Sequence, residues 1–230
     1  TSSFKKLWAK YESSVEQGLP KTGIDILSKI QDKAKGKRDI GHYFKATYLK
    51  AEQSMSLGYS DTKKNIEELE EWLAGVDTPD QKAIISAILF SNYLNYFNNN
   101  RYKFNELTDI EASEKPSDDI DQWTVNQYQT RINDLYDAIF VDSEFLLTKS
   151  AKDYIPFIEI HDFGKYFNHD LYHVIYTFTL NTLNSYPYGP GWRENLASDL
   201  RDTTIDLYHK NSDGVLLLEL DGFTSDRNFR

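Results

Sequence analysis

The sequence predicts an all-α protein, arranged as a helical-hairpin solenoid of tetratricopeptide-like (TPR-like) type with about eight to ten helices. Three observations predict this class. Apolar residues recur at helical spacing along most of the chain, Gly and Pro interrupt the stripes, and the helices pair with a period of about 35–40 residues. One hairpin cannot bury its own apolar face, so a neighbour must cover it. The tetratricopeptide consensus itself matches poorly, and we predict the architecture without the motif.

The first hairpin is predicted from two apolar stripes and the turn between them. The first stripe falls at i, i+3, i+4, i+7 and i+11 and consists of Phe4, Leu7, Trp8, Tyr11 and Val15. Gly18 suits a left-handed helix exit, and Pro20 suits the first position of the next helix. The second stripe closes near Gly36 and consists of Ile24, Leu27, Ile30 and Ala34.

Three more helices follow in the first half of the chain. The third stripe ends at Gly58 and consists of Phe44, Tyr48, Ala51 and Met55; the fourth consists of Ile66, Leu69, Leu73 and Val76. A fifth helix starts at Thr78-Pro79-Asp80-Gln81, where Thr78 and Gln81 can form a capping box. Its continuation, AIISAILFSNYLNYF, is apolar nearly all round, which predicts a helix enclosed by its neighbours.

The second half of the chain is less regular. Residues 98–121 interrupt the pattern with NNNRYKF and ASEKPSDDID, and we expect a long polar insertion loop there. A sixth helix fits 122–141, where Thr124 and Gln127 are a candidate capping box. A short turn is expected around Phe145–Leu147, and a break in the chain before the next proline.

Two late helices complete the predicted fold. One carries Leu171, Val174, Ile175 and Phe178, and the other begins at Trp192, after the turn SYPYGPG at 185–191. The segment VLLLEL at 215–220 fits a short buried helix or a strand equally well. We expect residues 1–230 to form a single repeat-like domain, with 98–121 as its insertion.

Composition excludes several classes of function. The formal charge of −10 disfavours nucleic acid and anionic membranes, because both need basic patches. The absence of Cys excludes disulfides, thiolate catalysis and Cys-ligated zinc. No apolar run approaches the roughly 18–20 residues of a membrane span. The chain starts at Thr1 and not at Met, which predicts a trimmed fragment of a longer protein whose leader, if any, has been removed.

The segment HDFGKYFNHDLYH, residues 161–173, is the strongest candidate for chemistry. Its candidate metal ligands are His161, Asp162, His169 and His173. The His-Asp pair is typical of HD-type metal-dependent phosphohydrolases, but the only earlier His, His42, is 119 residues away. His169 and His173 are four apart, as on a zincin helix, but Asp follows the first His where a zincin has Glu.

A structural interpretation explains more of this segment. Asn168 is a good N-cap, and Asp170 would lie in the first helical turn, where the helix dipole favours a carboxylate. His169 and His173 would then be partly exposed first-turn residues. We therefore expect no catalytic residue, no metal and no cofactor, and keep the phosphohydrolase as an alternative.

Two acidic stretches and one aromatic cluster complete the candidates. Glu67-Glu68-Glu70-Glu71 is predicted to be a solvated helix face. Ser117–Asp121 is predicted to be a solvated connection, since it lacks the Gly and Glu spacing of a calcium loop. The aromatic cluster fits core packing at a hairpin end. The alternative is a partner-binding surface, because Tyr and Arg are typical interface anchors. Its candidate residues are Tyr93, Tyr96, Phe97, Arg101 and Tyr102, beside Phe104.

Several segments carry a family resemblance. LWAKYESSVEQGLPKTGIDILSKIQDKA resembles the first helical hairpin of the large alpha-2-macroglobulin-like proteins of Bacteroidetes-type bacteria, in which a Trp-containing helix meets a Gly-Leu-Pro-Lys turn. YFNNNRY (96–102) is similar to a Tyr-x-x-Asn-Asn-Arg segment, and Asp119, Ile120 and Trp123 match Asp-Ile-x-x-Trp. LYHKNSDGVLLLEL is loosely similar to a Leu-Tyr-x-x-His stretch, whereas FNHDL at 167–171 departs from the expected Leu-Tyr-Asp.

The resemblance implies the N-terminal helical region of a much longer exported, protease-trapping protein. Later parts of such proteins carry β-sandwich domains, a bait segment and often a thioester, which a chain without Cys cannot hold. We expect a non-catalytic scaffold or protein-interaction domain in the periplasm or at the cell surface. Its partners would be downstream domains or another envelope protein. A glycan-binding module is the other alternative, which exposure of Trp8, Trp72, Trp123 or Trp192 would favour; we expect most of these to be buried.

Overall fold

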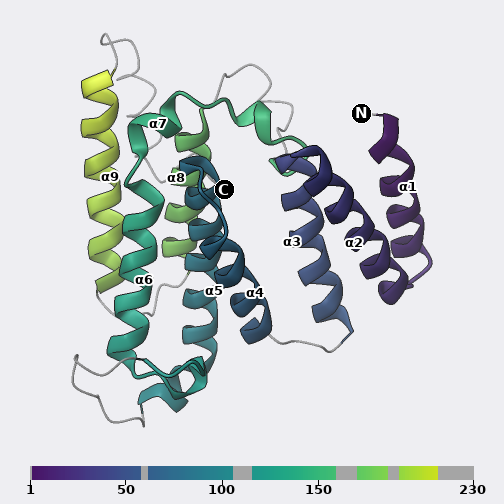
Figure 1. Cartoon of the computed structure of the whole chain (residues 1–230). Helices are drawn as coiled ribbons and strands as arrows, with labels where there is room; N and C mark the ends of the chain where they lie inside the picture. Colours follow the sequence, from purple (N-terminus) through teal and green to yellow (C-terminus); the bar gives the residue numbers. More distant parts are fainter. Residues whose placement is uncertain (1, 58–61, 106–115, 159–169, 186–191, 212–230) are drawn as a thin grey trace. The chain divides into compact units, whose positions relative to one another are not determined.

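The described residues of this computed structural model are helical, which confirms the predicted all-α class (Figure 1). The structure describes residues 2–57, 62–105, 116–158, 170–185 and 192–211. These ranges contain nine α-helices, two 3-10 turns (η) and no strand. The helices are α1 (Ser2–Glu16), α2 (Pro20–Lys37), α3 (Ile40–Ser56), α4 (Thr62–Ala74), α5 (Pro79–Asn105), α6 (Val125–Phe140), α7 (Ser143–Leu147), α8 (Leu171–Asn184) and α9 (Trp192–Asn211), with η1 at Ile120–Gln122 and η2 at Ala151–Tyr154.

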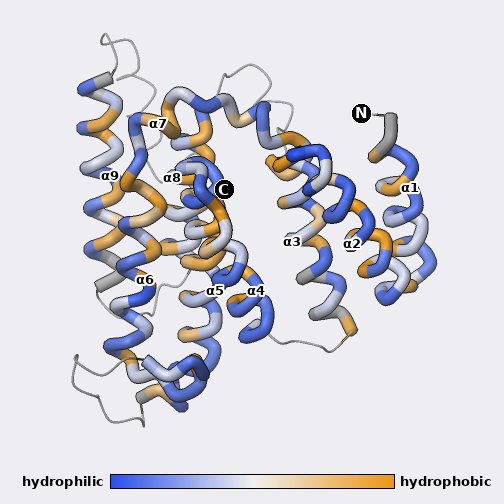
Figure 2. The backbone as a smooth tube through the Cα atoms, viewed as in Figure 1, coloured by the Kyte–Doolittle hydropathy of each residue, from blue (hydrophilic) through white to orange (hydrophobic). Residues whose placement is uncertain are grey.

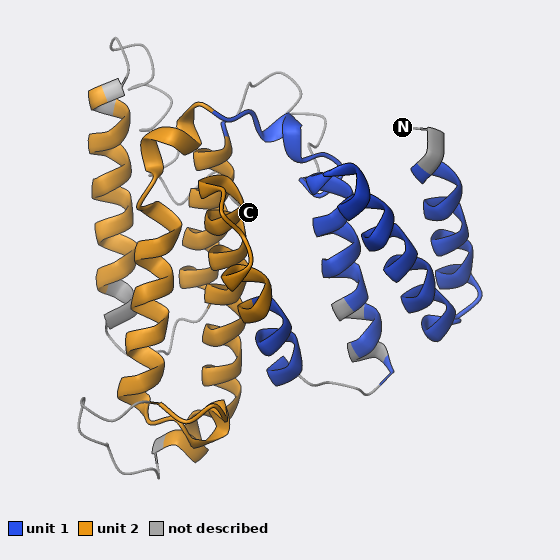
Figure 3. Ribbon diagram, in the orientation of Figure 1, with its two compact units in different colours: residues 1–69, 149–170 blue, residues 70–148, 171–230 orange. Residues whose placement is uncertain are grey.

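The chain divides into two compact units, which are coloured separately in Figure 3. Unit 1 comprises residues 1–69 and 149–170, and unit 2 comprises residues 70–148 and 171–230. The sequence predicts one continuous repeat-like domain, and the TPR-like regularity of the hairpins stays a prediction. Each unit is described by itself below.

Unit 1 begins with the predicted hairpin. Gly18 has a φ of +66° at the exit of α1, and Pro20 occupies the first turn of α2, as their residue types predict. α1 packs on α2, and α2 packs on α3. The left-handed residue that ends α2 is Arg38, with a φ of +54°, and not Gly36. The backbone N–H of Arg38 donates to carbonyls of the last turn and caps α2, which ends at Lys37, near Gly36 as predicted.

The core of unit 1 follows each of the three predicted stripes in part: Val15, predicted to belong to the first stripe, is 48% exposed. Its buried members are Phe4, Tyr11, Ile26, Leu27, Ile30, Ala34 and Ala46. Phe44 is also buried, and its ring packs against Phe157 with 5.2 Å between centroids. Tyr48, predicted to continue the third stripe, is instead 52% exposed. The side chains of Ala51 and Met55 lie outside the described set.

Unit 2 is a bundle around α5, which carries both apolar and polar stretches along its length in Figure 2. α5 packs against α6, α7 and α8, and α8 packs against α7 and α9. Because neighbours surround it, α5 buries Ile85, Leu89 and Phe90 as well as side chains on its other faces. This confirms the prediction of an enclosed helix.

The predicted insertion loop at 98–121 is wrong at both ends. α5 continues unbroken to Asn105, and η1 forms at Ile120. The asparagines do not end the helix, because Asn98 and Asn100 donate side-chain hydrogen bonds to backbone carbonyls four residues earlier. Phe104, fully buried, gives the last turn an apolar anchor. Residues 106–115 lie outside the described residues.

The N-terminus of α6 forms the predicted capping box. Thr124 Oγ1 accepts from the amide of Gln127, and the Gln127 side chain accepts from the amide of Thr124.

α8 and α9 occupy the predicted regions, and α7 covers the expected turn. Both the turn at 186–191 and the VLLLEL segment fall outside the description. No helix in the described ranges has the length and apolarity needed to cross a bilayer.

Candidate functional site

The aromatic cluster singled out in the sequence is the core at one end of unit 2. Tyr128 is fully buried at its centre, with its ring centroid 4.6 Å from that of Phe104, 5.3 Å from Trp123 and 5.4 Å from Phe97. Tyr93 stacks on Trp123 with 5.8 Å between centroids. Tyr93 and Phe97, two of the partner-binding candidates, are 2% and 3% exposed, which places them in the core and not at a surface.

Of the other partner-binding candidates, Tyr102 is exposed, and Tyr96 and Arg101 are half-buried. Tyr102 is 75% exposed, and the Arg101 guanidinium lies 5.1 Å from its ring centroid. The Arg101 hydrogen bond and positive charge lower the pKa of the Tyr102 hydroxyl. Tyr96 is half-buried, with its hydroxyl turned toward η1. Of the five residues predicted to form a partner-binding surface, only Arg101 and Tyr102 therefore remain candidates.

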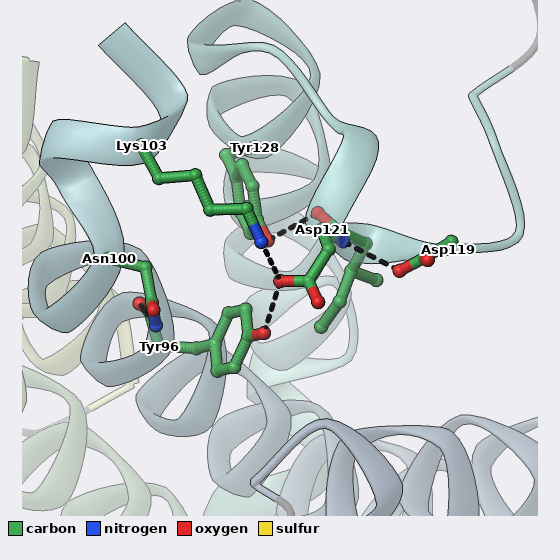
Figure 4. Close-up of polar contacts among 7 residues, drawn as sticks. Tyr96, Asn100, Lys103, Asp119, Asp121 and Tyr128 are labelled. Atoms are coloured by element: carbon green, nitrogen blue, oxygen red, sulfur yellow. Dashed lines mark hydrogen bonds and ion pairs between the residues drawn. The ribbon is translucent and has the colours of Figure 1, made fainter. Parts of the chain in front are cut away.

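A polar cluster around Asp121 joins the end of α5 to η1 (Figure 4). One carboxylate oxygen of Asp121 accepts a 2.6 Å hydrogen bond from the Tyr96 hydroxyl and lies 3.0 Å from Lys103 Nζ. The Asp121 amide donates to Asp119 Oδ1 at 2.9 Å, which caps the 3-10 turn. Tyr128 donates to the carbonyl of Ile120 at 2.7 Å, and burial raises the pKa of its hydroxyl.

This arrangement serves to hold a turn in place. The donors of Tyr96 and Lys103 converge on one carboxylate oxygen, so the charge of Asp121 is balanced where the turn meets the helix. The predicted solvated stretch 117–121 is therefore partly ordered: Asp118 is exposed, but Asp119 and Asp121 carry local hydrogen bonds.

A second polar network contradicts part of the prediction for the acidic run. Glu67, Glu68 and Glu71 are exposed as expected, but Glu70 faces the bundle. Arg131 donates to both carboxylate oxygens of Glu70, one bond of 2.9 Å and one shorter, and Tyr93 donates to Glu70 at 2.8 Å. This bidentate pair ties α4 to α6, with α5 supplying the tyrosine. Burial, together with the Glu70 charge, raises the pKa of the Tyr93 hydroxyl.

Most of the His-Asp segment is outside the described residues. His161, Asp162 and His169 cannot be placed, and neither can Asn168, the expected cap. Asp170 precedes α8 and forms an isolated antiparallel bridge with Ser150, so it does not lie in the first turn as predicted. His173 does lie in the first turn and is half-buried. Within the described ranges, no group of three or more His, Cys, Asp and Glu is placed to hold a metal ion.

His42 is part of a compact aromatic contact in unit 1 that the sequence did not indicate. Trp8 Nε1 donates a 3.0 Å hydrogen bond to His42 Nδ1, and the Phe4 ring stacks on the imidazole at 3.9 Å between centroids. Asp39 caps α3 by accepting from the His42 amide, and its carboxylate lies 4.0 Å from His42 Nε2. Burial lowers the pKa of His42, helped by Lys45 and the N-terminus and opposed by Asp39.

Acidification should weaken this contact. Protonation places a hydrogen on Nδ1, which can then no longer accept from Trp8. Because the folded pKa lies below the ordinary value of 6.5, the unfolded chain binds the proton more readily. The stability from neutral His42 is therefore complete above pH of about 6.5 and is lost as the pH falls below it. Urea unfolding at pH values from about 7.5 to 5 measures the free energy of unfolding of the unmodified chain and of His42→Gln. The same dependence of that free energy on pH in the two proteins would contradict the prediction.

The tryptophans give a mixed result for the glycan-binding alternative. Trp8, Trp72 and Trp123 are half-buried, and the side chain of Trp192 is outside the described set. Trp123 also donates to the carbonyl of Ser117 at 2.6 Å, a bond that holds the approach to η1. Comparison with known proteins gives no further guide: no protein-family model, no curated protein and no solved structure matches the chain.

Proposed function

We propose that this chain is a non-catalytic helical scaffold and protein-interaction region of an exported alpha-2-macroglobulin-like protein. The observation that carries the proposal is that ionisable side chains within unit 2 are paired with side chains of neighbouring elements. Glu70 is paired with Arg131, and Asp121 is held by Tyr96 and Lys103. Groups committed to holding helices together are typical of a scaffold.

The segments that resemble the family have defined local roles, which supports the same proposal. Gly18 and Pro20 make the turn between α1 and α2. In the Asp-Ile-x-x-Trp segment, Asp119 caps η1, Ile120 is buried and Trp123 stacks on the aromatic core. Each of these three residues therefore has a local structural role.

The test is to express the natural gene product and mix it with a protease. The proposal expects coding sequence beyond Arg230 for β-sandwich domains and a bait segment. It also expects trapped protease to cleave a small peptide substrate but not a large protein substrate. Replacing His161, His169 and His173 with Ala should leave trapping unchanged. A gene encoding a hydrolase domain, or a metal-dependent phosphodiesterase activity that this triple variant loses, would overturn the proposal.

A further inference from the structure

The charge of the chain is unevenly divided along its length. Residues 1–57 contain eleven Lys and Arg against six Asp and Glu, a formal charge of +5, whereas the remaining 173 residues carry −15. The overall charge of −10 therefore conceals a basic segment and does not by itself exclude an anionic partner. This segment contains α1, α2 and α3, which pack in sequence within unit 1.

The positive charge gathers at one end of these helices. In unit 1 the start of α1 lies at the same end as the junction of α2 and α3 (Figure 1). Only Asp32 and Asp39 oppose the positive charge in these turns. We define the basic end as Lys5, Lys6, Lys33, Lys35, Lys37, Arg38 and Lys45.

Contacts with two aromatic rings hold three of these lysines together. Lys33 Nζ and Lys37 Nζ lie 5.4 Å and 5.6 Å from the ring centroid of Phe4, and Lys45 Nζ lies 5.5 Å from that of Trp8. η2 packs on α3 and adds Lys152 and Asp153, whose formal charges cancel. η2 therefore leaves the formal charge at this end of unit 1 unchanged.

The residue types at the basic end favour binding to a surface with many spread-out negative charges over binding to a protein. Six of its seven cations are Lys, which acts as a hydrated point charge, whereas Arg and aromatic anchors dominate protein interfaces. Phe4 is only 2% exposed. In the described part of α1 to α3, the exposed large hydrophobic side chains are Val15, Leu19 and Tyr48, none of them in these turns.

We propose that the basic end docks on a membrane surface that carries anionic phospholipid, without inserting into it. A cluster of four to eight Lys and Arg at one surface is the pattern that binds such headgroups, at roughly fivefold in partitioning for each cation. Charges farther apart than about 8 Å are largely screened at physiological ionic strength, so docking depends mainly on the charges at the contact surface. This proposal does not depend on the proposed scaffold function.

Sedimentation with lipid vesicles tests the proposal. The full chain should bind vesicles containing about 30% phosphatidylglycerol at about 0.1 M salt, and should be released at about 0.5 M. It should not bind vesicles of phosphatidylcholine alone. The triple variant Lys5→Glu, Lys6→Glu, Lys35→Glu should partition at least about a hundredfold less, since each reversal removes and opposes one cation. These three side chains are exposed.

The matched control carries the same change of charge elsewhere in the chain. Lys21→Glu, Lys64→Glu, Lys82→Glu reverses three exposed lysines outside the basic end and should retain most binding. Circular dichroism checks that both variants are folded, and the salt dependence of the unmodified chain is a test that needs no variant. Equal loss of binding in both variants overturns the proposal. So does binding to phosphatidylcholine, or binding to polyglutamate or duplex DNA with none to the anionic vesicles.

Discussion

Replacing Tyr128 with alanine should lower the free energy of unfolding by about 3–5 kcal/mol. Its side chain is fully buried and contacts the rings of Phe97, Phe104 and Trp123. Truncation would remove the ring at the centre of this cluster and leave a cavity that several stiff aromatic neighbours cannot fill by small shifts. Urea unfolding, followed by circular dichroism, measures the change.

The conservative variant separates packing from hydrogen bonding. Tyr128→Phe keeps the ring and loses only the bond to the Ile120 carbonyl, so it should cost about 1 kcal/mol. The difference between the two variants is then the packing contribution. If Tyr128→Ala cost no more than Tyr128→Phe, the residue would not be the centre of the core of unit 2.

Replacing Gly41 with alanine should destabilise unit 1 by about 3 kcal/mol. A Cβ added at Gly41 would lie 2.3 Å from the carbonyl oxygen of Ile155 and 2.7 Å from its carbonyl carbon. These are backbone atoms, which have no rotamer with which to move away. Either the helix or the segment after η2 must shift, and the packing of Phe44 on Phe157 would be lost with it. Urea unfolding again gives the free energy.

Gly36 provides the matched control for this prediction. It lies inside α2, and an added Cβ would meet nothing within 4 Å. Gly36→Ala should therefore stabilise the chain by about 0.5–1 kcal/mol, because Ala loses less backbone entropy in a helix. Opposite signs for the two Gly→Ala changes are the expected result. A stabilising Gly41→Ala would show that the segment containing Ile155 does not pack against α3.

Local patterns made the helices predictable. The stripe that contains Leu27 and Ile30 needs only the 3.6-residue period, and the capping box at Thr124 needs only three residues of spacing. Such signals depend on neighbours in the sequence and carry over directly to the structure. The sequence also predicts the end of α2 near Gly36, and the helix ends at Lys37, although the left-handed residue there is Arg38 and not a glycine.

Long-range contacts account for what the sequence could not predict. Glu70 and Arg131 are 61 residues apart, and nothing in the acidic run marks Glu70 as the member that faces inward. The extension of α5 past residue 98 depends on burial of Phe104 against the ring of Tyr128, which propensity alone does not encode. For the candidate site, the sequence correctly indicated an aromatic core as one interpretation, but burial was needed to separate Tyr93 from Tyr102.

Measuring the metal content of the purified full chain tests most directly whether its ionisable side chains hold the fold together or serve a reaction. The scaffold interpretation predicts no stoichiometric transition metal in the chain. It also predicts the same unfolding free energy, within about 0.5 kcal/mol, for the double variant His169→Ala, His173→Ala. One tightly held transition metal per chain, lost in that variant together with a metal-dependent hydrolysis, would contradict it.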